Sequence, residues 1–434
     1  SDLDAVMTLS WTQIMRLGLV QMALGAIVVL TTSTLNRLMV VEFSLPALLP
    51  GLLVGLHYGI QLSRPRWGYT SDTGGNRTRW IIGGMVILAI GGFGAAFSVT
   101  LFAQSYALAL VLSVLAYALI GIGVGASGTS LLALLATATA PRRRAAAATI
   151  TWLMMIFGIA LTAGLAGSFL DPYSPERLLS VVAVVVTAAT LITILAIGRI
   201  ESRVSAMKEE APTPFLEGMR DIWGEPKTRN FTLFVFLSMN AYFMQELILE
   251  PYAGLVFNFT PGESTALSGA QNGGVFIGML IVGIVATGLK IGQLRTWVIA
   301  GCLGSCAVLG LICMTGFAYT GLNFSYLVVA LGVFNGMFAV AAIGSMMALA
   351  SEGRHQREGT RMGLWGAAQA IAAGFGGLTG ALLVDVMRKL TPDGPAFGTV
   401  FAFEALLFLA AALMAARVME TQKSPHTASL VPGE

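Results

Sequence analysis

The sequence predicts an all-α membrane protein with twelve transmembrane helices arranged in two six-helix halves. Of its 434 residues, 56% are hydrophobic and only 11% are charged, whereas a soluble domain carries about 25% charged residues. Apolar segments close to the roughly 20 residues that cross a bilayer recur along the whole chain. Arginine and lysine follow every second segment, which is the pattern of a multi-pass protein whose loops alternate between two compartments.

The predicted spans are separated by short polar connections. The first apolar segment follows a polar stretch and is too long for a removable signal peptide, so we expect it to be the first span. The twelve spans lie at about 14–40, 44–64, 79–101, 106–137, 145–170, 178–198, 230–250, 265–289, 295–317, 323–350, 361–387 and 396–417.

Basic residues are distributed unevenly between the two sets of connections. Every even-numbered span is followed by arginine or lysine, for example Arg142 to Arg144 after the fourth. The opposite connections hold only Arg37, Arg177, Arg388 and Lys389. Because basic loops stay in the cytoplasm, we expect both termini to be cytoplasmic.

The longest connection divides the chain into two parts. Residues 199–229 are polar and contain Pro212, Pro214 and Pro226, which favours a cytoplasmic linker. We therefore predict an N-terminal half at 1–198, a C-terminal half at 230–418 and a polar tail at 419–434.

Weak internal repeats support this division. Ser130 begins the run SLLAL in the fourth span, and Ser345 begins SMMAL in the tenth. Spans five and eleven end in Asp171 and Asp385. Six plus six spans with parallel repeats resemble the major facilitator architecture, in which an axis along the membrane normal relates the two halves.

The loop after the second span has a regular pattern of glycine, aspartate and arginine, at Gly68, Asp72, Gly75, Arg77 and Arg79. This pattern resembles the signature of the major facilitator superfamily. The glycines permit a tight turn at the membrane surface, and the aspartate can pair with an arginine or cap a helix. In the second half, Thr287 stands where the aspartate would be, so the signature has decayed there. The alternative is a glycine-rich turn with solvated charges.

Four separated blocks of the sequence carry a closer resemblance. They are residues 31–84, 141–158, 170–175 and 245–257, and the last reads QELILEPYAGLVF. In these blocks the chain resembles the PucC/LhaA family of purple phototrophic bacteria. The resemblance implies an assembly factor that binds bacteriochlorophyll a and delivers it to light-harvesting polypeptides, with the core (LH1) branch preferred. It also implies a bacterial inner membrane, the intracytoplasmic photosynthetic membrane. Bacteriochlorophyll synthase and the reaction-centre core are further implied partners, and carotenoid or lipid a further implied ligand.

His57 is the only histidine within a predicted span. Helical spacing places it on one face with Gln61 and Arg64. A neutral imidazole suits the magnesium of a chlorin, so one interpretation is an axial pigment ligand, because ionisable groups inside membranes are costly and usually functional. The alternatives are a proton-relay residue of a transporter and a hydrogen-bonded packing residue.

Three further polar residues are candidates for binding the pigment's carbonyl groups. They are Asn36, Asn240 and Gln245, which we expect to face the cleft between the halves. The alternative is that they join helices, since polar contacts between transmembrane helices contribute about 0.6 kcal/mol each.

Charged residues near the outer ends of spans one and seven predict a contact between the halves. Glu246 and Glu250 are four residues apart and share a helix face. We expect Arg37 to pair with one of them and to brace the outer mouth of the cleft. The alternative is a local pair with Glu42.

Several activities lack their signatures. The chain has no GxxxxGK[ST] motif, and it has no pattern of a zinc site or a nucleophile triad, so we expect neither an enzyme nor a nucleic-acid partner. The cysteines are interpreted as small packing residues at Cys302, Cys306 and Cys313. Two alternatives to the assembly factor stay open: a proton-coupled transporter of a small solute, and a scaffold without pigment.

Overall fold

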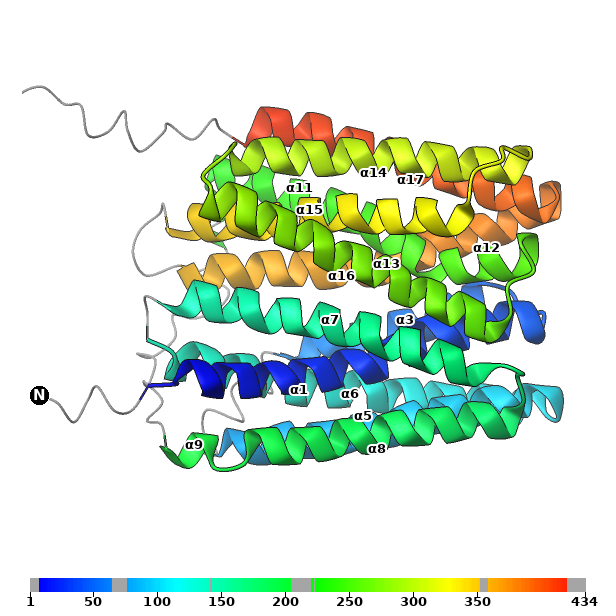
Figure 1. Cartoon of the computed structure of the whole chain (residues 1–434), viewed down its shortest axis with the longest axis horizontal. Coiled ribbons are helices and arrows are strands. Elements are labelled where there is room, and N and C mark those ends of the chain that lie inside the picture. Colours follow the sequence, from blue (N-terminus) through cyan, green and yellow to red (C-terminus); the bar gives the residue numbers. More distant parts are fainter. Residues whose placement is uncertain are drawn as a thin grey trace, which may run out of the picture.

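The computed structural model describes residues 8–64, 76–140, 143–203, 220–221, 223–351 and 358–419. Every regular element in these ranges is a helix, and the helices run side by side along one direction (Figure 1). The elements of the first half are α1 Trp11–Val29, α2 Leu35–Arg37, α3 Leu48–Ile60, α5 Arg77–Thr100, α6 Tyr106–Ala138, α7 Arg144–Leu170, α8 Pro175–Ile197 and α9 Ile200–Arg203. Those of the second half are α11 Pro226–Met244, α12 Leu249–Val256, α13 Pro261–Val282, α14 Leu294–Phe317, α15 Phe324–Ser351, α16 Glu358–Leu390 and α17 Asp393–Val418.

The helical membrane fold predicted from the sequence is confirmed. In the described part of the chain, 11 helices are long and apolar enough to cross a membrane. The remaining predicted span, 44–64, is the shorter apolar helix Leu48–Ser63. It begins later than expected because the chain turns at Ser44, whose φ is 52°, and Pro46 stands two residues further on.

Local sequence explains where several helices begin. Ser10 and Gln13 form a reciprocal capping box at the start of α1, and Thr260 and Glu263 form another at the start of α13. The side chain of Ser174 caps α8, whose first residue is proline. These caps satisfy backbone N–H groups that a helix start would otherwise leave unpaired.

Buried apolar side chains form two clusters. One is built almost entirely from the first half and includes Tyr117, and the other is built mainly from the second and includes Tyr252, Trp365 and Phe401. The predicted domain boundaries stay a prediction, because residues 204–219, residue 222 and the tail from 420 onwards lie outside the described residues.

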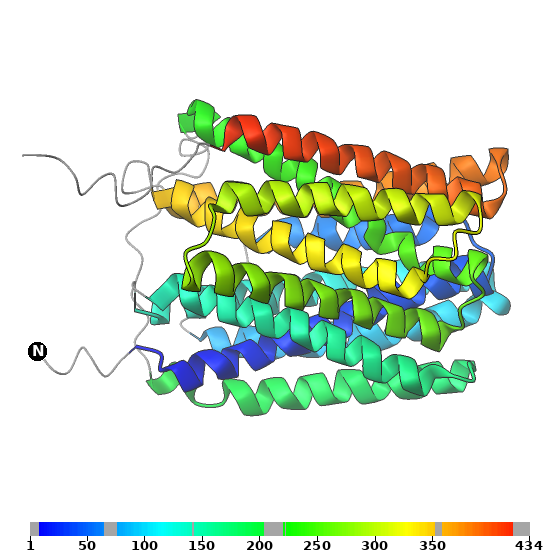
Figure 2. The same cartoon turned by 45° about the horizontal axis from the view of Figure 1, so that its top comes forward.

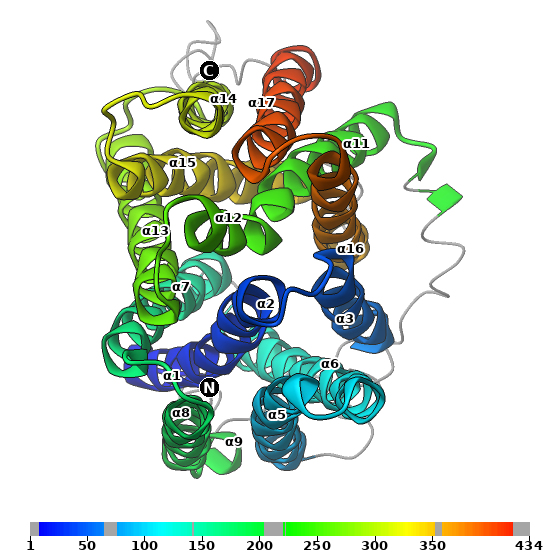
Figure 3. The ribbon, with the colours of Figure 1, turned by 90° about the vertical axis from the view of Figure 1, so that its right-hand side faces the viewer.

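The bundle has two ends, which are visible in Figure 2. We call the end where α1 begins and α17 ends the terminus end, and the other the far end; the charge pattern predicts that the terminus end is cytoplasmic. Seen from the far end, α2 and α12 lie next to each other near the middle of the bundle, between the two halves (Figure 3).

Candidate functional site

His57 is buried in α3, with 1% of its surface exposed. The Gln61 amide nitrogen lies 2.8 Å from His57 Nδ1, and Arg64 donates from Nη2 to Gln61 Oε1 at 2.8 Å. The predicted helix face therefore carries a continuous hydrogen-bonded chain of three side chains.

The hydrogen bonds from Arg64 to Gln61 and from Gln61 to His57 determine the tautomer of His57. A guanidinium group has only donors, so the oxygen of the Gln61 amide must face Arg64 and its NH₂ group must face the imidazole. His57 Nδ1 then accepts, and the ring proton of the neutral imidazole sits on Nε2. That Nε2 has no hydrogen-bond partner among the described residues.

The tautomer bears on the predicted role of His57 as a magnesium ligand. Ligation requires an unprotonated ring nitrogen, but Nε2 carries the proton and Nδ1 is occupied by Gln61. Nε2 would lose its proton only if the Gln61 amide were turned round, so that its oxygen accepted from a protonated Nδ1. The NH₂ group of Gln61 would then face Arg64, and two hydrogen-bond donors would point at each other. The arrangement therefore favours a hydrogen-bond donor at Nε2 over a metal ligand.

Arg37 does not form the ion pair that we expected with Glu246 or Glu250. Its Nη1 pairs with Glu42 at 2.5 Å, which is the local alternative. The side chain still crosses between the halves, because Nη2 donates to the carbonyl of Phe259 at 2.6 Å. The ion pair is local because Glu42 lies five residues along the same helical segment.

The predicted carbonyl-binding residues are all buried, and Asn36 and Gln245 lie between the halves. Asn36 donates from Nδ2 to the carbonyl of Leu247 at 2.8 Å, so it joins helices, as in the alternative interpretation. Oδ1 of Asn240 and Oε1 of Gln245 have no partner among the described residues. Glu250 lies beside Ser33, Ser264 and Ser268.

Two aspartates join the halves at the far end. Asp171, which follows α7, accepts from the Thr260 hydroxyl at 2.6 Å and from the Gly262 N–H at 3.1 Å, at the start of α13. Asp385 of α16 accepts from the N–H groups of Ala47 and Leu48 at 2.8 and 2.7 Å, at the start of α3. Each half therefore caps a helix of the other with a carboxylate.

A small polar cavity of about 80 Å³ lies between the halves. It has contributions from the end of α1 and the residues after it, from α11 and the turn after it, and from α13. A cavity of this size is too small for a pigment, since sites for small organic ligands occupy about 300–1,000 Å³. Its oxygen-bearing lining residues are Thr32, Ser33, Tyr242, Gln245, Glu246, Ser268, Gln271 and Asn272.

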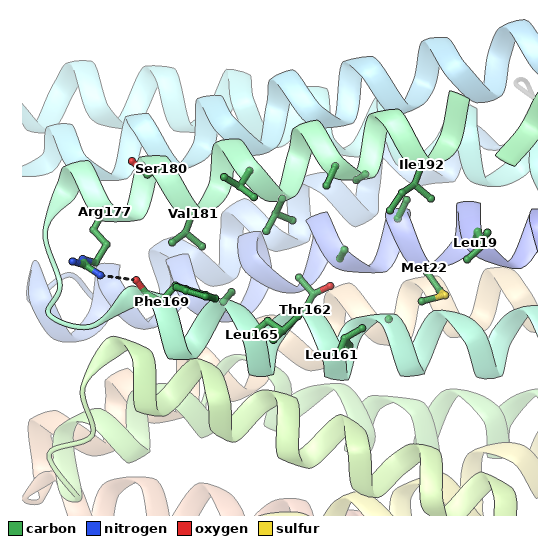
Figure 4. A pocket seen from close by; sticks show the side chains of 18 of the residues that line it. Leu19, Met22, Leu161, Thr162, Leu165, Phe169, Arg177, Ser180, Val181 and Ile192 are labelled. Atoms are coloured by element: carbon green, nitrogen blue, oxygen red, sulfur yellow. Dashed lines mark hydrogen bonds between the residues drawn. The ribbon is translucent and has the colours of Figure 1, made fainter. Parts of the chain in front are cut away.

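A far larger groove of about 870 Å³ lies on the outside of the first half, between α1, α7 and α8 (Figure 4). Its lining is mostly apolar and includes Leu165 and Phe169 from α7 and Ile192 from α8. Apart from Thr162, its polar residues gather at the far end, where Arg177 donates to the carbonyl of Phe169 at 3.2 Å. None of the predicted pigment-binding residues lines this groove.

The signature loop is described only in part. Gly68, Asp72 and Gly75 lie outside the described residues. Arg77 and Arg79 stand in the first turn of α5.

The carboxylate of Glu201 in α9 caps this same helix start. It accepts from the N–H groups of Arg77 and Thr78 at 2.8 and 2.7 Å. No local sequence pattern could predict this contact, because Arg77 and Glu201 are 124 residues apart.

The cysteines and the lone acid of α17 lie apart from these features. Cys302, Cys306 and Cys313 are free thiols within α14. Glu404 is fully buried, and its carboxylate oxygens have no partner among the described residues. The described ranges contain no group of three or more His, Cys, Asp or Glu side chains that could hold a metal ion.

Comparison with known proteins places the chain in a family. A family sequence model described as PUCC protein matches residues 34–423. The chain belongs to the PUCC family. A PUCC-family relative from Rhodobacter capsulatus, named bacteriochlorophyll synthase 44.5 kDa chain, is 63% identical over 99% of this chain and 100% of its own length. Protein PucC from Cereibacter sphaeroides is 31% identical and covers 92% of this chain and 90% of its own.

Solved structures confirm the predicted architecture of this PUCC-family chain. A bacterial homologue of the human lysosomal transporter Spinster has a TM-score of 0.63 at 15% identity and covers 94% of both chains. The nucleoside transporter NupG has a TM-score of 0.67 at 12% identity and covers 94% of this chain and 100% of its own. At these identities the likeness shows the fold alone, which is the major facilitator type.

Proposed function

We propose that this chain is an assembly factor for photosynthetic antenna complexes, which binds bacteriochlorophyll a and delivers it to core light-harvesting polypeptides. The observation that carries the proposal is the full-length match to PUCC-family relatives of purple bacteria, one of them named as a bacteriochlorophyll synthase chain. Its place would be the intracytoplasmic photosynthetic membrane, with both termini in the cytoplasm. Bacteriochlorophyll synthase and the reaction-centre core would be neighbouring partners.

The lateral groove is the place we assign to the pigment. Its volume of about 870 Å³ falls within the range of sites for small organic ligands. From Ser174 to Ile192 it follows 18 residues of α8, or about 27 Å at 1.5 Å per residue, close to the thickness of the hydrocarbon core. An amphiphile could enter it sideways from the lipid. A carotenoid or a lipid would compete for the same surface.

The groove assignment can be tested with two neighbouring residues of α8. Ala188 lines the groove, whereas Thr187 is exposed and does not line it. Purified from cells that make bacteriochlorophyll, the wild type and the Thr187→Trp variant should retain pigment in a fixed ratio to protein. Ala188→Trp fills the groove and should retain less.

Four results would contradict parts of the proposal. Equal pigment content in both tryptophan variants would place the pigment elsewhere, and a His57→Ala variant that alone loses pigment would return it to α3. A colourless protein that drives proton-coupled uptake in liposomes would be a transporter. A colourless protein that co-purifies with antenna polypeptides would be a scaffold.

The name of the Rhodobacter capsulatus relative favours a second candidate, a chain of the enzyme that makes bacteriochlorophyll. The two functions differ in what a deletion strain accumulates. Loss of an assembly factor should leave bacteriochlorophyll formation intact in isolated membranes while lowering the amount of assembled antenna. Loss of an enzyme chain should abolish pigment formation itself.

A further inference from the structure

The polar cavity between the halves contains a carboxylate without a cation. Glu246 lines it, and no lysine, arginine or histidine does. Among the described residues, Glu246 forms no ion pair. Arg37, the arginine that we expected to pair with it, pairs with Glu42 instead. A buried charge that is neither paired nor hydrated is very costly, so the ionised form of Glu246 needs a compensating positive charge.

Neutral oxygen atoms surround the same space. Gln245 is 2% exposed, and its Oε1 has no hydrogen-bond partner among the described residues. The hydroxyl of Thr32 gives its proton to the carbonyl of Val28 at 2.8 Å, which leaves its oxygen free to accept. Asn272 uses its amide NH₂ on the carbonyl of Ser268 at 2.9 Å, which leaves its Oδ1 free in the same way.

We propose that this cavity, which lies between the two halves of the protein, binds a small monovalent cation, namely Na⁺. One carboxylate balances one positive charge, and carboxylate, amide and hydroxyl oxygens are the ligands that hard cations prefer. A volume of about 80 Å³ holds the ion with several waters, since one water needs about 10–15 Å³. The site goes beyond the proposed function and does not depend on pigment binding.

The position of the site gives the ion a structural consequence. Thr32 and Ser33 come from the first half, whereas Gln245, Glu246, Gln271 and the other ligands come from the second. A cation bound by both sides stabilises the arrangement in which the halves are in contact. Glu250, one turn after Glu246, is a second acid close to the site and lies beside Ser33, Ser264 and Ser268.

Thermal unfolding of the purified full-length chain in detergent tests the proposal. The midpoint is measured in NaCl and in choline chloride at equal ionic strength, over a range of Na⁺ concentrations. We expect a saturable rise with Na⁺ in the wild type, and its loss in Glu246→Gln. Glu404→Gln is the matched control, because Glu404 is a fully buried acid that lies in α17, away from the cavity.

Two further variants keep the test decisive if Glu246→Gln does not fold. Gln245→Leu and Ser268→Ala remove neutral ligands only, and each should shift the Na⁺ concentration for half-maximal effect upwards by about tenfold or more. Identical midpoints in Na⁺ and choline for the wild type would overturn the proposal. So would a Na⁺ response that persists unchanged in Glu246→Gln, or one that is lost in Glu404→Gln to the same extent.

Discussion

His57 shows how one arginine can determine the chemistry of a residue two helical turns away. Arg64 orients the Gln61 amide, and the amide orients the imidazole proton onto Nε2. The spacing of these residues predicted that they share a face. It did not predict which nitrogen carries the proton, because that depends on the order of donors and acceptors along the chain of hydrogen bonds.

The tautomer can be measured without any pigment. The chain has three histidines, so ¹⁵N-labelled imidazole signals can be assigned by replacing His355 and His426 with asparagine. The NMR spectrum of the neutral ring of His57 should show a protonated Nε2 and an unprotonated Nδ1. In Gln61→Leu the constraint is removed, and the proton should distribute between both nitrogens. A wild-type signal from protonated Nδ1 would show that the amide is oriented the other way.

Arg37 is a second residue whose partner lies close to it in the sequence. Its guanidinium is 3% exposed and is held by Glu42 and by the carbonyl of Phe259. Arg37→Gln leaves buried acceptors unpaired and should cost about 1–3 kcal/mol of stability, visible as a lower unfolding midpoint. Glu42→Gln should cost less, because that carboxylate reaches solvent.

A charge exchange distinguishes this account from a pair across the halves. Arg37→Glu combined with Glu246→Arg should unfold at no higher temperature than the less stable single variant. Recovery of stability in the double variant would show that the two side chains pair after all.

At the scale of elements, the sequence located the helices within a few residues, and it singled out Asp171 and Asp385 as equivalent endings of two spans. Their role as caps on helices of the opposite half could not be predicted. Asp385 meets Leu48 across 337 residues, and no local pattern reports such a pairing. The apolar pattern misplaced the start of α3, and it also ended the span predicted at 230–250 too early, since that span continues to Val256.

We expect the two aspartate caps to hold the two halves together at the far end. The Thr34 and Thr265 hydroxyls lie 2.8 Å apart across the halves, so cysteines at both positions should form a disulfide in a cysteine-free background. Replacing Asp171 and Asp385 together by alanine removes four hydrogen bonds to helix starts or their caps and should lower the yield of that disulfide.

Asp393→Ala is the control for this experiment, because Asp393 pairs with Arg388 within the second half. It should leave the disulfide yield unchanged. An unchanged yield in the double aspartate variant would mean that other contacts, such as that of Arg37 with Phe259, are enough to hold the far end together.

At the scale of the molecule, the alternation of apolar and basic segments predicted the twelve-helix architecture. It could not predict the cavities, because their volumes depend on how side chains of different helices interlock. The lateral groove is built by residues from α1, α7 and α8 that carry no motif, such as Ala166 and Val184. The pigment-binding residues chosen from the sequence were polar, whereas the only cavity of pigment size among those described here is mostly apolar.

Transfer of pigment in vitro tests the proposed delivery. The chain would be purified with bound bacteriochlorophyll a and mixed in detergent with pigment-free core light-harvesting polypeptides, and the absorption of the pigment followed over time. We expect the absorption band of the chain-bound pigment to decline as that of the assembled antenna appears, and we expect Ala188→Trp, but not Thr187→Trp, to transfer less pigment. Purified chain that holds no pigment, or pigment that reaches the polypeptides equally fast without the chain, would contradict it.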